Sequence, residues 1–163
     1  MTAIEHEARL RHERHVDHPT HRPLSHNYEY VGLRGEQEYA REFGCKVDLS
    51  AKPGGDGGRD FGLAAIGYGH VIIDVKTARK RKSLLVEVGK AKPLTIYVLA
   101  GYEDVHDSVM LIGWEWGWKV LKAPTGYFSN PVLNHFIPAR ELRSIDELHR
   151  RLLNPLDDME GQS

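Results

Sequence analysis

Residues 71–77 read VIIDVKT, and this stretch decides the fold that we expect. Successive side chains of a β-strand point to opposite faces of the sheet. Ile73 and Val75 therefore share one face, and Asp74 and Lys76 share the other. The pattern predicts a strand with one apolar face toward a core. Its second face carries a carboxylate and an ammonium group two residues apart.

The segment before this strand is rich in glycine. PGGDGGRD, residues 53–60, contains four glycines and one proline, a composition typical of a loop with unusual backbone angles. We expect residues 59–66 and 70–76 to form a hairpin after this loop. Asp60 then lies near the start of the first strand, beside the strand that carries Asp74.

A helix is predicted further upstream, from Leu33 to Phe43. Its apolar residues recur at the spacing of one helical face, and Gly44 is of the type favoured just after a helix end. Glu36 falls on this otherwise apolar stripe. The sequence therefore predicts one carboxylate on the inward face of the helix.

Shorter signals predict the elements that follow. In chain order we expect a buried strand over 94–100 (LTIYVLA), a second over 109–113 (VMLIG), a short helix between Trp114 and Pro124, a Pro/Gly/Asn-rich loop over 123–138, and a final helix that opens with the capping box Ser144-x-x-Glu147 and ends near Leu153. Together the elements predict an α/β fold, with a central mixed sheet of about four or five strands and helices on both faces.

Composition limits the class of protein. The chain has 163 residues, of which 40% are hydrophobic, and this suits one globular domain. We expect that domain over residues 28–153, after an arm (1–27) and before a polar tail (154–163). No apolar run is long enough for a membrane span, and the polar N-terminal stretch does not resemble a secretory signal. Cys45 is the only cysteine, which excludes an internal disulfide and favours a cytoplasmic location.

Histidines are concentrated in the arm, where residues 1–27 hold six of the ten. On a helix, His12 and His15 would share a face and could bind a transition metal. Pro19 and Pro23 interrupt helical continuity, however, and no cysteine supports such a site. We expect a solvated arm that is able to lie along DNA.

The charge distribution is uneven. The net charge is −1, so the chain lacks the strongly basic balance typical of many nucleic-acid binders. Residues 76–92 nevertheless contain seven basic residues and one acidic residue, a local excess that can neutralise phosphates. We expect nucleic-acid contacts from Arg79, Lys80, Arg81, Lys82 and Lys90. Tryptophans also stack on bases, but we expect Trp114 to lie in the core.

Four residues form a set that suits phosphodiester hydrolysis: Glu36, Asp60, Asp74 and Lys76. Carboxylate oxygens are the ligands that Mg²⁺ prefers, and a bound metal lowers the pKa of its water and polarises the phosphate. Lys76 can orient the attacking water and offset developing negative charge. The set therefore predicts a metal-dependent hydrolase that acts on nucleic acid.

These motifs together resemble those of the PD-(D/E)XK nuclease superfamily, the fold of many restriction endonucleases, Holliday-junction resolvases and phage exonucleases. Gly32–Glu36 resembles the helix motif, residues 58–61 (GRDF) the first acidic motif, and residues 74–76 (DVK) the (D/E)XK signature. Arg59 stands where the family name has Pro. The resemblance covers residues 30–100 and is greatest to small phage and prophage nucleases.

The resemblance implies a restriction-endonuclease-like fold and a deoxyribonuclease that depends on Mg²⁺ or Mn²⁺. Glu36, Asp60 and Asp74 would hold the metal with the backbone carbonyl of Val75, and Lys76 would complete the site. It also implies DNA as the partner and a bacterial host cytoplasm if a phage encodes the protein. Many relatives work as homodimers, but the oligomeric state of this chain stays open. Endonuclease and exonuclease activities both stay open, as do one and two metal ions.

Other functions fit parts of the sequence. The main alternative is a non-catalytic nucleic-acid binder with the same fold, although degenerate binders usually lose an acid or the lysine, and here all are present. A metal-storage or metal-sensing protein would use the His-rich arm. In a purely structural interpretation, Asp74 and Lys76 are exposed edge residues and Asp60 caps a turn. Glu36 would then complement a helix dipole.

Overall fold

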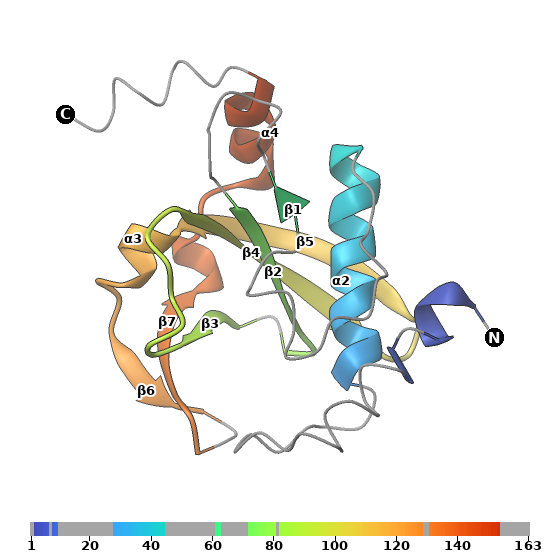
Figure 1. The fold of residues 1–163 in the computed structure, drawn as a ribbon, viewed down its shortest axis with the longest axis horizontal. Helices are drawn as coiled ribbons and strands as arrows, with labels where there is room; N and C mark the ends of the chain where they lie inside the picture. The colour runs from blue at the N-terminus through green and yellow to red at the C-terminus, as the bar shows by residue number, and fades with distance from the viewer. Residues whose placement is uncertain are drawn as a thin grey trace.

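A computed structural model of the protein describes residues 2–6, 8–9, 28–44, 61–62, 72–80, 82–128 and 131–153. In chain order its elements are α2 (Tyr28–Phe43), β1 (Phe61–Gly62), β2 (Ile72–Ala78), β3 (Ser83–Glu87), β4 (Thr95–Glu103), β5 (Ser108–Trp116), α3 (Gly117–Val120), β6 (Thr125–Tyr127), β7 (Leu133–Pro138), the 3₁₀ helix η2 (Ala139–Glu141) and α4 (Ile145–Leu153) (Figure 1). The chain is therefore mixed α/β, as the sequence predicts.

The strands form two sheets. The main sheet has four strands in the order β1-β2-β4-β5 and the second has three in the order β3-β7-β6. In the main sheet β2 runs parallel to β4, while β1–β2 and β4–β5 are antiparallel pairs, so the sheet is mixed. The pairs of the second sheet are antiparallel.

Helices α2 and α4 pack on the same face of the main sheet. The buried apolar cluster on this face contains Tyr39, Ala40, Ile73, Val75, Ile96, Val98, Ala100, Leu111, Trp114, Trp116 and Leu148. Phe43, at the end of α2, stacks on His149 of α4 with ring centroids 4.0 Å apart. Trp114 is fully buried here, which confirms its predicted place in the core.

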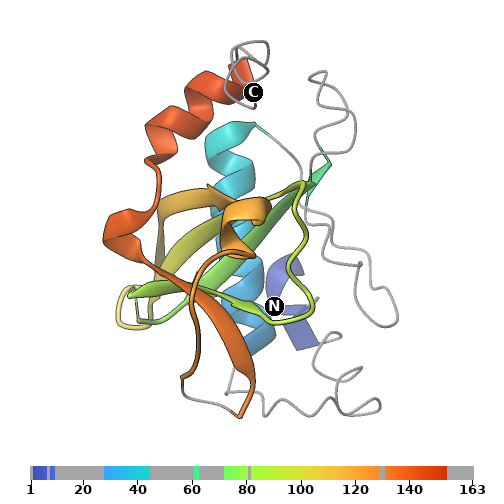
Figure 2. The ribbon, with the colours of Figure 1, turned by 90° about the vertical axis from the view of Figure 1, so that its left-hand side faces the viewer.

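The opposite face of the main sheet packs against the second sheet and α3. Its buried cluster contains Leu84, Val86, Tyr97, Leu99 and Val120. Figures 1 and 2 show the strands of the main sheet between α2 on one side and β6 and β7 on the other. The sequence predicted helices on both faces, but this face is covered mainly by a sheet, with the short helices α3 and η2 beside it.

The predicted long loop over 123–138 is also wrong, because this stretch contains β6 and β7. Its Pro, Gly and Asn residues favour a loop locally, but β7 pairs with β3, a strand about fifty residues earlier, and Leu84 faces Ile137 in that ladder. Proline is tolerated because Pro138 is the last residue of its strand.

Several local predictions are confirmed. Strand β4 begins one residue after the start of the first apolar run, at Thr95, and continues beyond its end to Glu103, and β5 contains the second run and extends beyond it on both sides. Helix α4 begins after Ser144, whose Oγ accepts a hydrogen bond from the Glu147 amide at 3.1 Å. Helix α2 covers the predicted helix but begins five residues earlier, at Tyr28, against a prediction of Leu33. In the predicted hairpin, the described part of the first strand is β1, which pairs antiparallel with β2.

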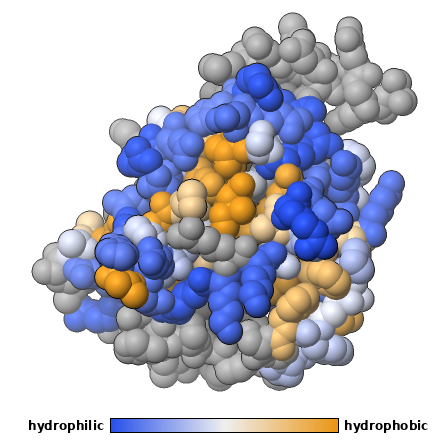
Figure 3. Space-filling view, turned by 180° about the vertical axis from the view of Figure 1, so that it is seen from behind, coloured by the Kyte–Doolittle hydropathy of each residue, from blue (hydrophilic) through white to orange (hydrophobic). Residues whose placement is uncertain are grey.

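The surface is mixed in character. Figure 3 shows the molecule from behind, with apolar residues gathered near the centre of this face and hydrophilic residues around them. Within the ranges that the structure describes, no helix has the length and apolar character needed to cross a membrane.

Candidate functional site

Asp74 and Lys76 come together on β2. Lys76 Nζ lies 2.9 Å from Asp74 Oδ1. The Asp74 side chain is buried, whereas that of Lys76 is 41% exposed. An ionised carboxylate is costly to bury unless it is paired, and the lysine supplies a partner while keeping part of its length in solvent. The two residues therefore form an ion pair in which the aspartate side chain is buried and the lysine side chain is partly exposed.

Tyr97 is the neighbour of Asp74 across the sheet, since the two are register partners in the β2–β4 ladder. Burial raises the pKa of the Tyr97 hydroxyl, and the nearby Asp74 charge acts in the same direction. The Tyr97 hydroxyl accepts a hydrogen bond from the Lys92 backbone amide at 2.9 Å. The face that carries Asp74 is thus closed on this side by a neutral phenol and by the turn before β4.

Glu36 is buried on α2, as its predicted place on the inward stripe requires. The preceding residue, Gly35, packs directly on β2: a Cβ added there would lie 1.8 Å from Thr77 Oγ1. That hydroxyl oxygen is buried and has no hydrogen-bond partner in the described part of the chain. Helix and strand therefore approach closely at the residue next to Glu36, and only glycine permits this distance.

Glu36 and Asp74 approach from opposite sides of β2. Ile73 and Val75 lie in the cluster under α2, so by strand alternation Asp74 points to the other face, where its partner Tyr97 belongs to the second cluster. The sequence pattern predicted an inward Glu36 and an outward Asp74, but not that β2 itself would lie between them.

The edge of β2 is where groups from its two faces are able to meet. All residues of β2 pair with β4 at one edge, whereas at the other edge β1 pairs only with Ile72 and Ile73 of β2. Asp74 is the next residue along β2. In the described chain no strand covers this edge beyond Ile73, so Asp74 lies where the edge begins to open.

Asp60, the third predicted carboxylate, lies outside the described residues, as does the glycine loop before it. Its covalent neighbour is Phe61, the first residue of β1, which pairs with Ile73 immediately before Asp74. Across the described ranges, no group of three or more His, Cys, Asp or Glu side chains is placed to hold a metal ion. The described members of the predicted set are Glu36, Asp74 and Lys76.

The donor chemistry of the predicted set suits a hard divalent cation. Glu36 and Asp74 offer carboxylate oxygens, the ligand class of Mg²⁺ and Mn²⁺. The Val75 side chain is a hydrocarbon buried in the cluster under α2, and the backbone carbonyl is the oxygen that this residue has. Both carboxylates are buried, one on α2 and one on β2, and their donor atoms are of the class that such a cation takes.

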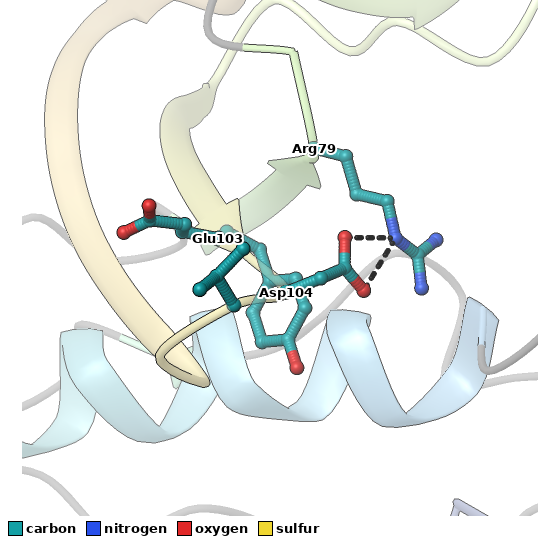
Figure 4. Close-up of a pocket in the computed structure, with 5 residues that line it drawn as sticks. Arg79, Glu103 and Asp104 are labelled. Atoms are coloured by element: carbon teal, nitrogen blue, oxygen red, sulfur yellow. Dashed lines mark hydrogen bonds and ion pairs between the residues drawn. The ribbon is translucent and has the colours of Figure 1, made fainter.

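The first basic residue after β2 has an acidic partner. Arg79 Nε donates to Asp104 at 3.2 Å (Oδ1) and 2.9 Å (Oδ2), and its guanidinium lies 5.8 Å from the centre of the Tyr102 ring. Figure 4 shows Arg79 reaching from the end of β2 to Asp104 along a hollow that Tyr102, Glu103 and Val105 also line. A phosphate at Arg79 would therefore compete with Asp104.

The other predicted phosphate contacts differ in their surroundings. Lys80 and Lys82 are exposed in the turn between β2 and β3. Lys90 Nζ lies 2.9 Å from Glu87 Oε2. Arg81 lies outside the described residues, as do Cys45 and most of the His-rich arm. Lys80 and Lys82 are thus the predicted contacts that the structure presents most openly.

Glu115 is a buried acid that the sequence patterns did not single out. It pairs across the sheet with Tyr97, on the side opposite to Asp74, and its Oε1 accepts hydrogen bonds from Arg143 Nε at 3.1 Å and from the Trp116 amide at 2.9 Å. Its position in the run LIGWEW was the available signal, because a lone acid inside an apolar strand needs a partner.

Comparisons of the chain with known protein families, with curated proteins and with solved structures found no match. The arrangement of the site and the chemistry of its residues therefore carry the functional argument.

Proposed function

We propose that the protein is a Mg²⁺- or Mn²⁺-dependent nuclease that hydrolyses phosphodiester bonds in DNA. The observation that supports this most directly is the pair formed by Asp74 and Lys76, in which a buried carboxylate lies 2.9 Å from the ammonium of a side chain that is 41% exposed. Among the residues that the structure describes, the pair lies where the pairing of β1 with β2 ends. Buried Glu36 is on the helix that packs on the same strand.

The proposal includes a restriction-endonuclease-like fold of the PD-(D/E)XK type. In its support, the chain has the expected element order of a helix with an inward Glu, a short strand after Asp60, and the strand of Asp74 and Lys76. The last two strands are antiparallel neighbours in a mixed sheet of four strands. The second sheet on the far face is then an addition to such a core.

In this proposal Glu36, Asp60 and Asp74 hold the cation at the edge of β2. When bound, a divalent ion lowers the pKa of its water and neutralises charge on the phosphate. The attacking water oxygen forms a bond to phosphorus, the bond from phosphorus to the leaving oxygen breaks, and that oxygen takes up a proton.

Lys76 positions the attacking water and the phosphate in this proposal. Its three N–H donors can hold Asp74, the attacking water and a phosphate oxygen at once. Its exposed end is accessible to substrate, while the contact with Asp74 fixes its direction. Developing negative charge on the phosphate is thereby offset by an ammonium group that is already in place.

The direct test is incubation of the purified protein with supercoiled, linear, branched and single-stranded DNA, in Mg²⁺, Mn²⁺ or EDTA. We expect cleavage that requires the divalent ion, and the preferred substrate separates endonuclease from exonuclease action. A folded Asp74→Asn protein run in parallel should lose nearly all activity. Cleavage that persists in EDTA, or at the parent rate in the Asp74→Asn protein, would contradict the proposal.

A further inference from the structure

Two lysine-containing segments lie side by side at one end of the main sheet. The first is the turn over residues 88–94 (VGKAKPL), before β4, and the second is residues 117–122 (GWKVLK), which contain α3. The Trp118 amide donates to the Pro93 carbonyl at 3.1 Å. A Cβ added at Gly117 would lie 1.7 Å from the Lys92 carbonyl oxygen, so glycine is required for this contact.

Trp118 is the tryptophan that reaches the surface here. It is 36% exposed, whereas Trp114 and Trp116 are buried. The Nζ atoms of Lys119 and Lys122 each lie 5.6 Å from the centre of the Trp118 ring. The structure thus presents an aromatic face with two ammonium groups beside it.

Two exposed leucines lie in the same two segments as Trp118. Leu94 follows Pro93, whose carbonyl accepts the hydrogen bond from the Trp118 amide, and Leu121 is the residue after α3. The two segments together carry four lysines and no acidic residue. We call the surface formed by Trp118, Leu94, Leu121 and the lysines at 90, 92, 119 and 122 the Trp118 surface.

Acidic side chains offset part of the positive charge of these lysines. Lys90 pairs with Glu87, and Lys119 Nζ lies 3.9 Å from buried Glu115, at the limit of an ion pair. The contact that the structure gives for the Lys122 ammonium is with the Trp118 ring. The surface therefore has positive charge available to an anionic polymer.

The Trp118 surface adjoins the proposed active site. The Lys92 amide binds the hydroxyl of Tyr97, and Tyr97 is the cross-strand partner of Asp74. β2 and β4 are parallel, so their first residues, Ile72 and Thr95, are also partners. The turn that ends at Leu94 thus reaches the sheet beside the end of β2 that carries Asp74.

We propose that the Trp118 surface binds single-stranded nucleic acid, with a base stacked on Trp118 and flanking phosphates on the lysines. This inference rests on the proposed nuclease function. In it, the Trp118 surface holds the substrate strand next to the bond that is cleaved. An aromatic ring flanked by ammonium groups suits unpaired bases, whose faces are free to stack, whereas bases inside a duplex are already stacked. The combination also explains why an apolar ring is exposed among lysines.

The test uses the intrinsic fluorescence of the full-length protein in EDTA, where metal-dependent cleavage cannot occur. A stacked base should quench Trp118, while the buried Trp114 and Trp116 respond little. The probes are a 20-nucleotide oligo-dT and an abasic oligonucleotide of the same length, which has the phosphates without the bases. We expect quenching by oligo-dT and much weaker quenching by the abasic strand.

Three variants sharpen the result. Trp118→Ala should weaken oligo-dT binding, measured by anisotropy of a labelled strand, about 5- to 150-fold, the range for loss of one stacked base. Trp118→Phe, which keeps an aromatic face, should retain more affinity than Trp118→Ala. Tyr127→Ala, which removes an exposed aromatic from β6, is the matched control and should bind as the parent protein does.

Each outcome bears on the inference separately from the nuclease proposal. Equal quenching by the abasic strand would show a purely electrostatic contact and overturn the stacking assignment. Unchanged binding by Trp118→Ala would overturn the surface, even if the parent protein cleaves DNA. Selective loss of binding in Trp118→Ala would support the surface, even if the cleavage assay showed no activity. Preference for anionic lipid vesicles over oligo-dT would also contradict it.

Discussion

Asp74 and Glu115 are two buried carboxylates in the same row of the main sheet, one on each side of Tyr97. They are almost equally buried, at 6% and 4% exposure. Their partners differ. Asp74 pairs at 2.9 Å with a lysine that is partly exposed, whereas Glu115 accepts hydrogen bonds from Arg143 Nε and a backbone amide. The lysine neighbour of Glu115, Lys119, is 3.9 Å away.

The contacts of Arg143 indicate a structural role for Glu115. Arg143 bonds to Glu115 from β5 and to Glu147 of α4 at 3.4 Å, and its guanidinium lies 5.3 Å from the centre of the Trp114 ring. Its backbone also bridges to Trp114 in both directions. These contacts hold α4 against β5 of the main sheet. Burial alone therefore does not identify a functional acid, and the partner of the acid is the better guide.

The largest effect that this comparison predicts is on cleavage. Asp74→Asn should lower the rate on the order of 100-fold or more, since metal-assisted charge stabilisation contributes several kcal/mol and each 1.4 kcal/mol is tenfold. Glu115→Gln, the matched change on the other side of Tyr97, should cleave at the parent rate per folded molecule. The measurement is initial rate in Mn²⁺ at a temperature where circular dichroism shows both variants folded. Equal loss in both would show that the two acids do not differ in role.

The second prediction concerns stability, where the order should reverse. Glu115→Gln removes the charge that faces Arg143 Nε, while Arg143 keeps its contact with Glu147. A hydrogen bond to a charged group contributes about 1.5–3 kcal/mol, and the amide oxygen can still accept it, so the expected loss is about 1.5 kcal/mol. For a chain of this size that is a fall in Tm of roughly 3–6 °C. Asp74→Asn should melt close to the parent protein in EDTA, and a larger fall there would contradict the division of roles.

The third prediction asks whether Glu36 belongs with Asp74. At one hundred times the Kd, Mn²⁺ should stabilise the parent protein by about 2.7 kcal/mol. Glu36→Gln keeps the shape of the side chain and removes its charge, so it should melt no lower in EDTA while its Mn²⁺-induced rise becomes smaller. A tenfold weaker Kd would reduce the stabilisation by about 1.4 kcal/mol.

Glu42→Gln is the control for this measurement. It removes an exposed carboxylate from the same helix, where Glu42 lies 3.5 Å from His149 of α4. Its melting curve should shift with Mn²⁺ as the parent curve does. If Glu36→Gln behaves like this control, then Glu36 is a structural acid of the Glu115 kind and not a metal ligand.

The smallest predicted effect is a change in the salt dependence of DNA binding when lysines of the basic turn after β2 are replaced. Each phosphate contact adds about −0.9 to the slope of log affinity against log salt for duplex DNA. Replacing Lys80 and Lys82 with Ala should flatten that slope, whereas Arg79→Ala should change it less because Asp104 already holds the guanidinium. Asp104→Asn should strengthen binding by releasing Arg79. The slope is measured by anisotropy at several salt concentrations in EDTA.

Arg150→Ala, an exposed substitution on α4, is the control for the salt series. It should leave the slope unchanged, because α4 packs on the face of the main sheet opposite to the second sheet and is not part of the basic turn. A slope that stays constant in the Lys80 and Lys82 variants would show that the turn is merely solvated.

Local chemistry made much of the fold predictable from the sequence. The alternation in VIIDVKT determines which side chains of β2 share a face, and the capping box places the start of α4 at Ser144. Apolar runs locate β4 and β5 because buried strands need little besides β-branched and aromatic residues. These signals involve residues close together in the chain, so no distant partner is needed to interpret them.

Only the tertiary structure decided where the acids lie relative to one another. The sequence determined that Glu36 is on an inward stripe and that Asp74 alternates with core residues, but the packing of Gly35 on Thr77 decides which face of β2 the helix covers. The pairing of β3 with β7 and the contact of Arg143 with Glu115 likewise join distant segments. Such contacts depend on which surfaces bury the most apolar area together, a property of the whole chain that no local pattern contains.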